Sequence, residues 1–284
     1  MIKLIAIGVV IGIANVIPGV SGGTMAVSMG IYDKLIHALT HIFSEFKQTL
    51  KLLIPIAIGA GIALVGLSKL IMIALEYVPV PTNLFFIGLI IGGMPAIWNR
   101  LKATEQKVGV GNMIATLVFF ALVVGFALLG EGESQDTTIV FSLVNVLKLF
   151  GVGVIASATM VIPGVSGSMV LMLMGYYESI LSNISLLVDG LTSFDIPVML
   201  QAIGVLAPFG VGVVIGIGVI AKLVEIVFLR LPNYAYCSII GLIAASPFAI
   251  IIMSDFSQYT ILSVAIGIVT LVAGFAIAMK LGEK

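Results

Sequence analysis

Two short segments of this 284-residue chain carry hydroxyl groups beside glycines in nearly the same order: PGVSGGT at residues 18–24 and PGVSGS at residues 163–168. Glycines let a backbone approach a ligand, helix N-termini offer unpaired N–H groups, and hydroxyls donate further hydrogen bonds. The segments therefore predict an anion-binding site. The alternative is that the small residues only allow close helix packing. The expected contributors are Asn15, Gly19, Ser21, Gly22, Gly23 and Thr24 from the first copy, and Gly164, Ser166, Gly167 and Ser168 from the second.

Lys69 and Lys222 are the next candidates, because each lies inside a long apolar run. An ionisable group in such a run is costly and is usually functional, so we expect both to bind the charge of an anion. The alternative is that their long stems reach to the nearest polar interface. Glu225 follows Lys222 by three residues and shares its helix face, which leaves an ion pair and a proton relay as two open roles.

Three further residues are candidates for coupling or gating. Asp33 and Glu178 each follow a tyrosine at matching positions of the two longer apolar stretches that contain these motifs, residues 3–38 and 145–187. Lys148 lies near the start of the second stretch. Solvated helix ends and an interfacial anchor are the plainer interpretations.

No metal or other cofactor is expected. His37 and His41 have the i, i+4 spacing of a metal-binding pair, but no third ligand lies nearby in the sequence. The one cysteine, Cys237, excludes an intramolecular disulfide.

The composition is that of a membrane protein. The chain is 61% hydrophobic and 9% charged, with mean hydropathy +1.28, whereas soluble domains carry roughly 25% charged residues. A water-soluble fold is excluded. The net charge of zero leaves no basic field for nucleic acid.

Six apolar runs are long enough to cross a bilayer as helices, which needs about 20 residues each. The predicted spans are 52–77, 83–99, 111–130, 198–229, 234–254 and 260–280.

Two other apolar stretches, 3–38 and 145–187, are too long for one crossing and are each interrupted by Pro-Gly near the middle. Proline removes a backbone donor and glycine permits positive φ, so the tip is expected to be non-helical. Non-helical backbone at membrane depth must line a cavity or be buried in protein. Each stretch therefore predicts a re-entrant helical hairpin.

The chain contains an internal repeat. A shift of 145 aligns residues 8–35 with 153–180, with 12 of 28 positions identical, and a shift of 153 aligns Lys69 with Lys222. The single membrane domain 1–284 thus divides into repeats 1–140 and 141–284, each one hairpin plus three spans. Because three is odd, the second repeat is predicted to be inverted. Inverted repeats favour a transporter, although enzymes and scaffolds also arise by duplication.

Basic residues agree with this topology. With both termini cytoplasmic, ten of the thirteen Lys and Arg residues fall on the cytoplasmic side, as the positive-inside rule expects.

The motifs NVIPGVSGGTMAVSMGIYD and MVIPGVSGSMVLMLMGYYE resemble those of a bacterial membrane family associated with polyprenyl-phosphate transport and formerly known only as a domain of unknown function. The resemblance covers essentially the whole chain. It implies a flippase that returns undecaprenyl phosphate from the outer to the inner leaflet of the bacterial cytoplasmic membrane, for reuse in cell-envelope synthesis. It also implies that the motif tips, 15–24 and 162–168, are the functional residues.

Two alternatives are kept. Membrane undecaprenyl-pyrophosphate phosphatases share two re-entrant hairpins and a Pro-Gly-x-Ser tip, but neither tip here carries the carboxylate or arginine that phosphoryl transfer needs. The chain is therefore not expected to be an enzyme. The other alternative is a transporter of another lipid or of a small anion. The expected partners are the lipid substrate and the surrounding membrane lipids. A second copy of the chain, in a homodimer, is a further candidate, because glycine faces pack either within a chain or between chains.

Overall fold

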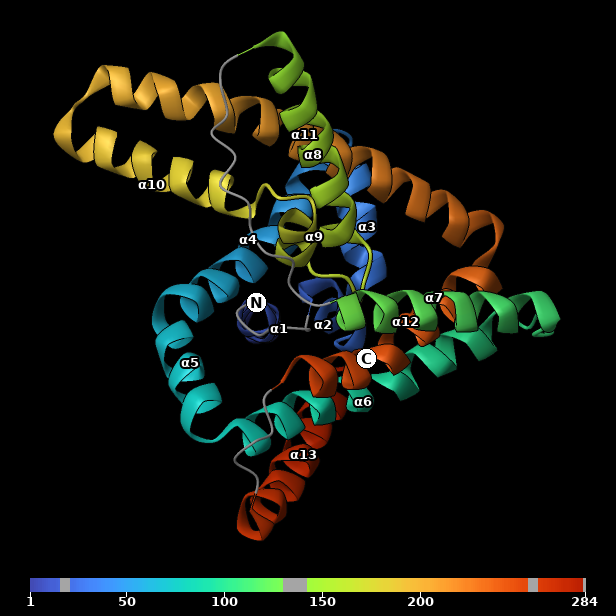
Figure 1. The fold of residues 1–284 in the computed structure, drawn as a ribbon. Coiled ribbons are helices and arrows are strands. Elements are labelled where there is room, and N and C mark those ends of the chain that lie inside the picture. The colour runs from blue at the N-terminus through green and yellow to red at the C-terminus, as the bar shows by residue number, and fades with distance from the viewer. Residues whose placement is uncertain (16–20, 130–141, 255–259, 283–284) are drawn as a thin grey trace. The chain divides into compact units, whose positions relative to one another are not determined.

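The computed structural model describes residues 1–15, 21–129, 142–254 and 260–282. Every regular element of these residues is helical. The elements are α1 (Ile2–Ala14), α2 (Gly22–Ser28), α3 (Tyr32–Thr40), α4 (Phe46–Ile62), η1 (Ala63–Leu67), α5 (Ser68–Tyr77), α6 (Pro79–Ala103), α7 (Val110–Leu129), α8 (Leu143–Val161), α9 (Gly167–Leu173), α10 (Tyr177–Ser193), α11 (Ile196–Arg230), α12 (Pro232–Met253) and α13 (Ile261–Gly282) (Figure 1).

Seven helices of the described residues are long and apolar enough to cross a membrane. The prediction of an all-α, multi-pass membrane protein is thus confirmed. Six of the seven match the predicted spans to within a few residues, except that the first helix begins earlier, at Phe46, and continues through the π-helical turn η1 into α5. The seventh is α8, which the sequence predicted as a hairpin limb. Its 19 residues cover about 28 Å, whereas the 13 residues of α1 cover only about 20 Å.

The chain divides into two compact units. Unit 1 comprises Met1–Leu128, Pro163–Val165 and Ala221–Lys284, and unit 2 comprises Leu129–Ile162 and Ser166–Ile220. The second Pro-Gly motif is therefore divided between them, and each unit is described separately below.

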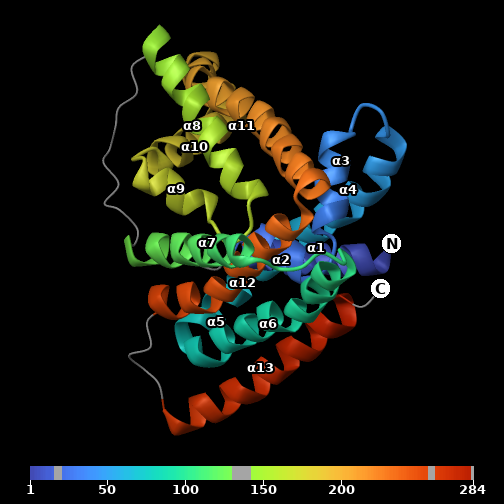
Figure 2. The ribbon, with the colours of Figure 1, turned by 90° about the vertical axis from the view of Figure 1, so that its right-hand side faces the viewer.

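The most extensive helix pair in unit 1 is α6 with α13, which lie side by side (Figure 2). Glycines make this approach possible. A Cβ on Gly88 would collide with the carbonyl of Leu271, and one on Gly274 would collide with the carbonyl of Phe85. Small residues let helices pack backbone to backbone in membranes, where van der Waals contact replaces the hydrophobic effect.

The pair α7 and α12, also in unit 1, packs by the same device. A Cβ on Gly241 would collide with the carbonyl of Thr116. The Thr116 hydroxyl donates to the carbonyl of Cys237 at 2.9 Å, and the rings of Phe120 and Phe248 meet edge to face. Cys237 is a free cysteine buried in this pair.

The helix that precedes each Pro-Gly motif packs against the long helix that follows in its own half of the chain. In unit 1, α1 meets α4 where Gly8 faces the carbonyl of Ile56 and Gly59 faces that of Ile5. In unit 2, α8 meets α11 where Gly153 faces the carbonyl of Phe209 and Gly212 faces that of Phe150. These residues correspond pairwise under the shifts of 145 and 153.

The segment after each motif is not one continuous limb. α2 and α9 are only 7 residues long, and each ends at a glycine with positive φ, Gly30 at 68° and Gly175 at 74°. An L side chain strains this backbone, so glycine ends the short helix and α3 or α10 starts in a new direction. Residues 3–38 and 145–187 therefore each contain three helices in place of the two limbs of a simple hairpin.

Candidate functional site

The first motif places two hydroxyl groups at the start of α2. Ser21 is the N-cap of this helix, and its Oγ accepts a hydrogen bond from the backbone N–H of Thr24 at 3.1 Å. The two hydroxyls are also hydrogen-bonded to each other at 2.9 Å. The side chain of Thr24 is fully buried and that of Ser21 is nearly so. A serine N-cap satisfies one of the orphan donors of the helix end.

Both hydroxyls hold a backbone group of the second motif. The N–H of Gly164 donates to Ser21 Oγ at 3.0 Å and to Thr24 Oγ1 at 2.8 Å. Gly164 has a φ of 85°, a conformation that glycine adopts without strain. This region of unit 1 therefore joins two segments more than 140 residues apart through a buried polar contact.

Asn15, at the end of α1, also belongs to this tip. Its Oδ1 accepts from the backbone N–H of Gly22 at 3.2 Å. A Cβ on Gly22 would come within 2.8 Å of the same oxygen, so glycine permits this approach. Gly23 follows within α2. The predicted site residue Gly19 lies outside the described residues.

The second tip, in unit 2, has a different hydrogen-bond pattern. Ser166 precedes α9 without a side-chain cap bond, and its hydroxyl is bonded to that of Ser168 at 2.8 Å in an exposed position. Gly167 lies against Thr159 of α8. The two serines thus present their hydroxyls at the surface of the unit.

The lysines are placed differently from each other. Lys222 forms an ion pair with Glu225, Nζ to Oε2, at 2.5 Å, as the shared helix face predicts. Lys69 is in α5, but its side chain lies outside the described part of the structure. Lys148 is exposed in the second turn of α8.

Asp33 has a partner that sequence reasoning missed. Arg100, near the end of α6, forms an ion pair with the Asp33 carboxylate through Nη1 and donates from Nη2 to the carbonyl of Gly30 at 2.9 Å. The arginine therefore holds the turn between α2 and α3. Glu178 occupies the corresponding position in the first turn of α10, where the second half has Met253 in place of the arginine.

Arg100 also lines an open depression of about 380 Å³ in unit 1, together with Ala103, Thr104, Pro232 and Tyr236. Tyr32 lines a separate, smaller pocket that also includes Arg100 and Tyr236, and burial raises the pKa of this phenol well above its usual range, so it stays neutral at physiological pH.

The histidines require a correction. The sequence offered no third ligand near His37 and His41, but Glu225, which is distant in the chain, supplies one. Its Oε1 lies 3.3 Å from His41 Nδ1 and 3.8 Å from His37 Nδ1. No local signal points to this contact, because α3 and the end of α11 meet only in the folded chain.

Comparisons with known proteins agree with one another. The sequence pattern of the family described as VCA0040-like, undecaprenyl phosphate translocase-like, matches residues 11–268. A polyprenyl-phosphate transporter of Staphylococcus aureus is 30% identical over 97% of this chain and 94% of its own length. A polyprenyl-phosphate transporter of Vibrio cholerae is 31% identical over 62% of this chain and 58% of its own length. No solved structure matches.

Proposed function

This chain belongs to the VCA0040-like, undecaprenyl phosphate translocase-like family, and we propose that it carries a polyprenyl phosphate across the membrane. The proposed substrate is undecaprenyl phosphate, and the proposed direction is from the outer to the inner leaflet of the bacterial plasma membrane. Both termini are proposed to be cytoplasmic, and no chemical step on the lipid is proposed. The relatives named above are transporters by name, which supports transport over phosphatase activity.

The observation that carries the proposal is the shared hydrogen bonding of Gly164 with Ser21 and Thr24. In an apolar environment, polar groups are retained where they have a partner or a function. A phosphate oxygen accepts hydrogen bonds from the same donors, namely the N–H of Gly164 and the two hydroxyls. We therefore propose that the lipid phosphate enters this contact, with Asn15, Gly22 and the helix start around it.

The hydroxyls of the second tip are proposed as further phosphate ligands. The hydroxyls of Ser166 and Ser168 are hydrogen-bonded to each other, and within their unit Ser166 is half-buried and Ser168 is exposed. Exchange of a hydroxyl–hydroxyl bond for a charge-assisted bond to phosphate is favourable, because bonds to ionised groups are about twice as strong. Gly19, Gly23 and Gly167 are proposed to permit close approach of the backbone.

Lysine charges complete the proposal. Lys222 and Lys69 are proposed to attract the phosphate head group, and Glu225 is proposed to neutralise Lys222 when lipid is absent, as their ion pair suggests. Asp33, Glu178 and Lys148 are proposed to respond to the change between two conformations. In this view the bond between Asp33 and Arg100 opens or shifts when the first tip moves.

The repeat explains how one site serves two faces. The glycine contacts of α1 with α4 recur between α8 and α11. This recurrence supports a duplication with repeats at residues 1–140 and 141–284. We propose that the copies are inverted and that residues 3–38 and 145–187 are re-entrant. Two similar halves can then exchange inward-open and outward-open arrangements around a site at midplane.

Reconstitution in sealed vesicles tests the proposal. A labelled prenyl monophosphate is placed in one leaflet and its movement to the other is followed over time. We expect the wild type to accelerate movement over empty vesicles, and the Ser21→Ala/Ser166→Ala variant to lose most of this gain. Ser28→Ala is the matched control, because Ser28 is a buried serine of the same short helix that donates to the carbonyl of Ile90 and lies outside the proposed site.

Three outcomes would contradict the proposal: no acceleration by the wild type with or without a pH gradient, equal loss in the Ser28→Ala control, or full activity in the double variant. Release of inorganic phosphate from a prenyl pyrophosphate in the same vesicles, dependent on the tip serines, would support a phosphatase instead.

A further inference from the structure

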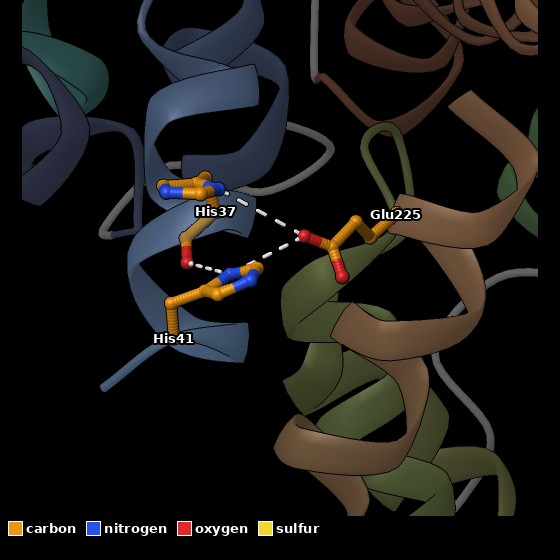
Figure 3. Close-up of side chains that lie close together, drawn as sticks. All are labelled: His37, His41 and Glu225. Atoms are coloured by element: carbon orange, nitrogen blue, oxygen red, sulfur yellow. Dashed lines mark hydrogen bonds and ion pairs between the residues drawn. The ribbon is translucent and has the colours of Figure 1, made fainter. Parts of the chain in front are cut away.

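Two histidines and a glutamate in unit 1 come together outside the motif tips. His37 and His41 lie one turn apart on α3, with their rings stacked at 4.2 Å between centroids. Glu225 comes from the last part of α11 and its carboxylate points at both rings (Figure 3). One potential ligand atom from each residue lies within 4.8 Å of the others.

The spacing of these atoms is that of a tetrahedral metal site. Ligands at about 2.0–2.1 Å from a tetrahedral zinc ion are about 3.3 Å from one another. The Oε1 atom of Glu225 lies 3.3 Å from His41 Nδ1 and 3.8 Å from His37 Nδ1. These two distances are within about half an ångström of that value, and the third, between the two histidine nitrogens, is at most 4.8 Å, so the stacked rings must turn toward each other to surround an ion.

The second groups on two of the three ligands, His37 and Glu225, also have partners. His41 Nδ1 itself lies 2.9 Å from Thr40 Oγ1 and 3.2 Å from the carbonyl oxygen of His37, and an ion would replace these contacts. Histidine ligands usually donate their other ring N–H to a carboxylate, and ligating carboxylates are themselves hydrogen-bonded. His37 Nε2 lies 3.4 Å from the carboxylate of Glu45. The second carboxylate oxygen of Glu225, Oε2, accepts a hydrogen bond from Lys222 Nζ at 2.5 Å. The other oxygen, Oε1, faces the histidines.

Access and charge are compatible with an exchangeable ion. The side chain of His37 is 53% exposed and that of Glu225 is 11% exposed, so the site has an open side and a buried side. The Thr40 hydroxyl donates to Oε1 at 3.0 Å and would rotate away when an ion binds. The two carboxylates, Glu45 and Glu225, outweigh the single ammonium of Lys222 when the histidines are neutral.

We propose that His37 Nδ1, His41 Nδ1 and Glu225 Oε1 bind one divalent transition-metal ion of the zinc class, with a fourth position open to water or an exchangeable ligand. Imidazole together with carboxylate suits zinc and cobalt, whereas calcium and magnesium take oxygen ligands. The ion would fasten α3 to the end of α11. This site shares Glu225 with the proposed transport mechanism, but it does not require that the chain carries a lipid, and its test measures metal binding alone.

Cobalt binding tests the site directly. The full chain is purified in detergent without a histidine tag, stripped with a chelator, and titrated with Co²⁺ alone. We expect one equivalent to bind, with the intense visible absorption of a tetrahedral cobalt centre, and stoichiometric Zn²⁺ to remove that absorption. His41→Ala and Glu225→Gln are expected to abolish it. Glu45→Gln is expected to weaken affinity about 10- to 100-fold, as for other residues that support a ligand.

Lys34→Ala is the matched control, because Lys34 is exposed on the same helix, α3, and should bind cobalt like the wild type. Thermal unfolding provides a second measurement. Zinc should raise the unfolding midpoint of the wild type and of Lys34→Ala, and leave His41→Gln unchanged. The proposal is overturned if the wild type shows no saturable binding, or if the histidine and glutamate variants bind as tightly as the control.

Discussion

The two Pro-Gly motifs share a scaffold but differ in their polar contacts. Before each motif, a glycine-containing helix packs closely against the long helix that follows it, with Gly59 and Gly212 facing backbone carbonyls in the same way. At the tips the likeness ends, because Ser21 is buried against the N–H of Gly164 whereas Ser166 is half-buried and bonded to the exposed Ser168. Close packing is thus common to both copies, and hydrogen bonding distinguishes them.

This difference indicates which residues must stay alike in a duplicated protein. Backbone-to-backbone contacts depend on the absence of a side chain, so any substitution affects them and both copies keep glycine. Tip hydroxyls depend on what they meet, and the two tips meet different groups. The following variants test this distinction between the shared glycine packing and the differing tip hydroxyls, from the largest expected effect to the smallest.

Glycine-to-alanine substitutions in the shared scaffold should have the largest effect. Gly59→Ala and Gly212→Ala would each press a Cβ into a backbone carbonyl, and we expect each to cost about 3 kcal/mol or more, since backbone cannot yield as a side chain does. Thermal unfolding in detergent measures the loss. Gly61→Ala and Gly210→Ala are the controls, because open space surrounds both positions, and they should be neutral or stabilising. A large effect in one copy alone would refute the equivalence of the two scaffolds.

The tip hydroxyls should separate the copies. In Ser21→Ala/Thr24→Val, the part-buried N–H of Gly164 loses both acceptors, which we expect to cost about 1–2 kcal/mol. In Ser166→Ala/Ser168→Ala only an exposed bond is lost, and stability should change by less than about 0.5 kcal/mol. Both double variants should lose translocation. Equal unfolding midpoints for the two would show that the tips do not differ in burial.

The turn glycines should respond alike in the two copies. Gly30 and Gly175 both have positive φ, so alanine at either position should cost about 1 kcal/mol through backbone strain. Gly151→Ala, within α8 and with open space around it, is the control that should not be destabilised. A cost at Gly30 alone would mean that the second turn relaxes freely.

The last comparison concerns the arginine that only the first copy has, where the expected effect is also small. Arg100→Gln removes the ion pair with Asp33 and weakens the bond to Gly30. Because both charged side chains are about one-third exposed, we expect a loss of about 0.5–1 kcal/mol. Arg230→Gln, at the exposed end of α11, should change the unfolding midpoint less. The idea that Arg100 fixes the first turn is contradicted if the two variants are equal.

Most of the helical architecture was predictable, because long apolar runs have few other stable forms in a bilayer. The predicted span 83–99 appears as α6 and 260–280 appears as α13. The breaks after α2 and α9 were missed. Gly30 and Gly175 were visible as matching positions, but a glycine in an apolar run marks close packing as often as a turn.

The sites were less predictable, because they depend on contacts between distant parts of the chain. The shared helix face of Lys222 and Glu225 followed from i, i+3 spacing alone, although that spacing left an ion pair and a proton relay open. The contact of Glu225 with Thr40, 185 residues away, and that of Arg100 with Asp33 had no local sequence signal. The hydrogen bond of Gly164 to the first motif was equally out of reach, since the repeat shows that two tips exist and not that they touch.

The glycine contact between α6 and α13 also has a consequence for biosynthesis. Gly88 faces Leu271, and α13 follows α6 in the chain only after α7 to α12. Helix α6 therefore enters the bilayer long before its main partner exists, and its small-residue face must wait against lipid or an insertion factor. A nascent chain stalled before residue 261 would carry this face unpacked. The exposed small-residue face would then be the feature by which a quality-control protease distinguishes an unfinished molecule from a finished one.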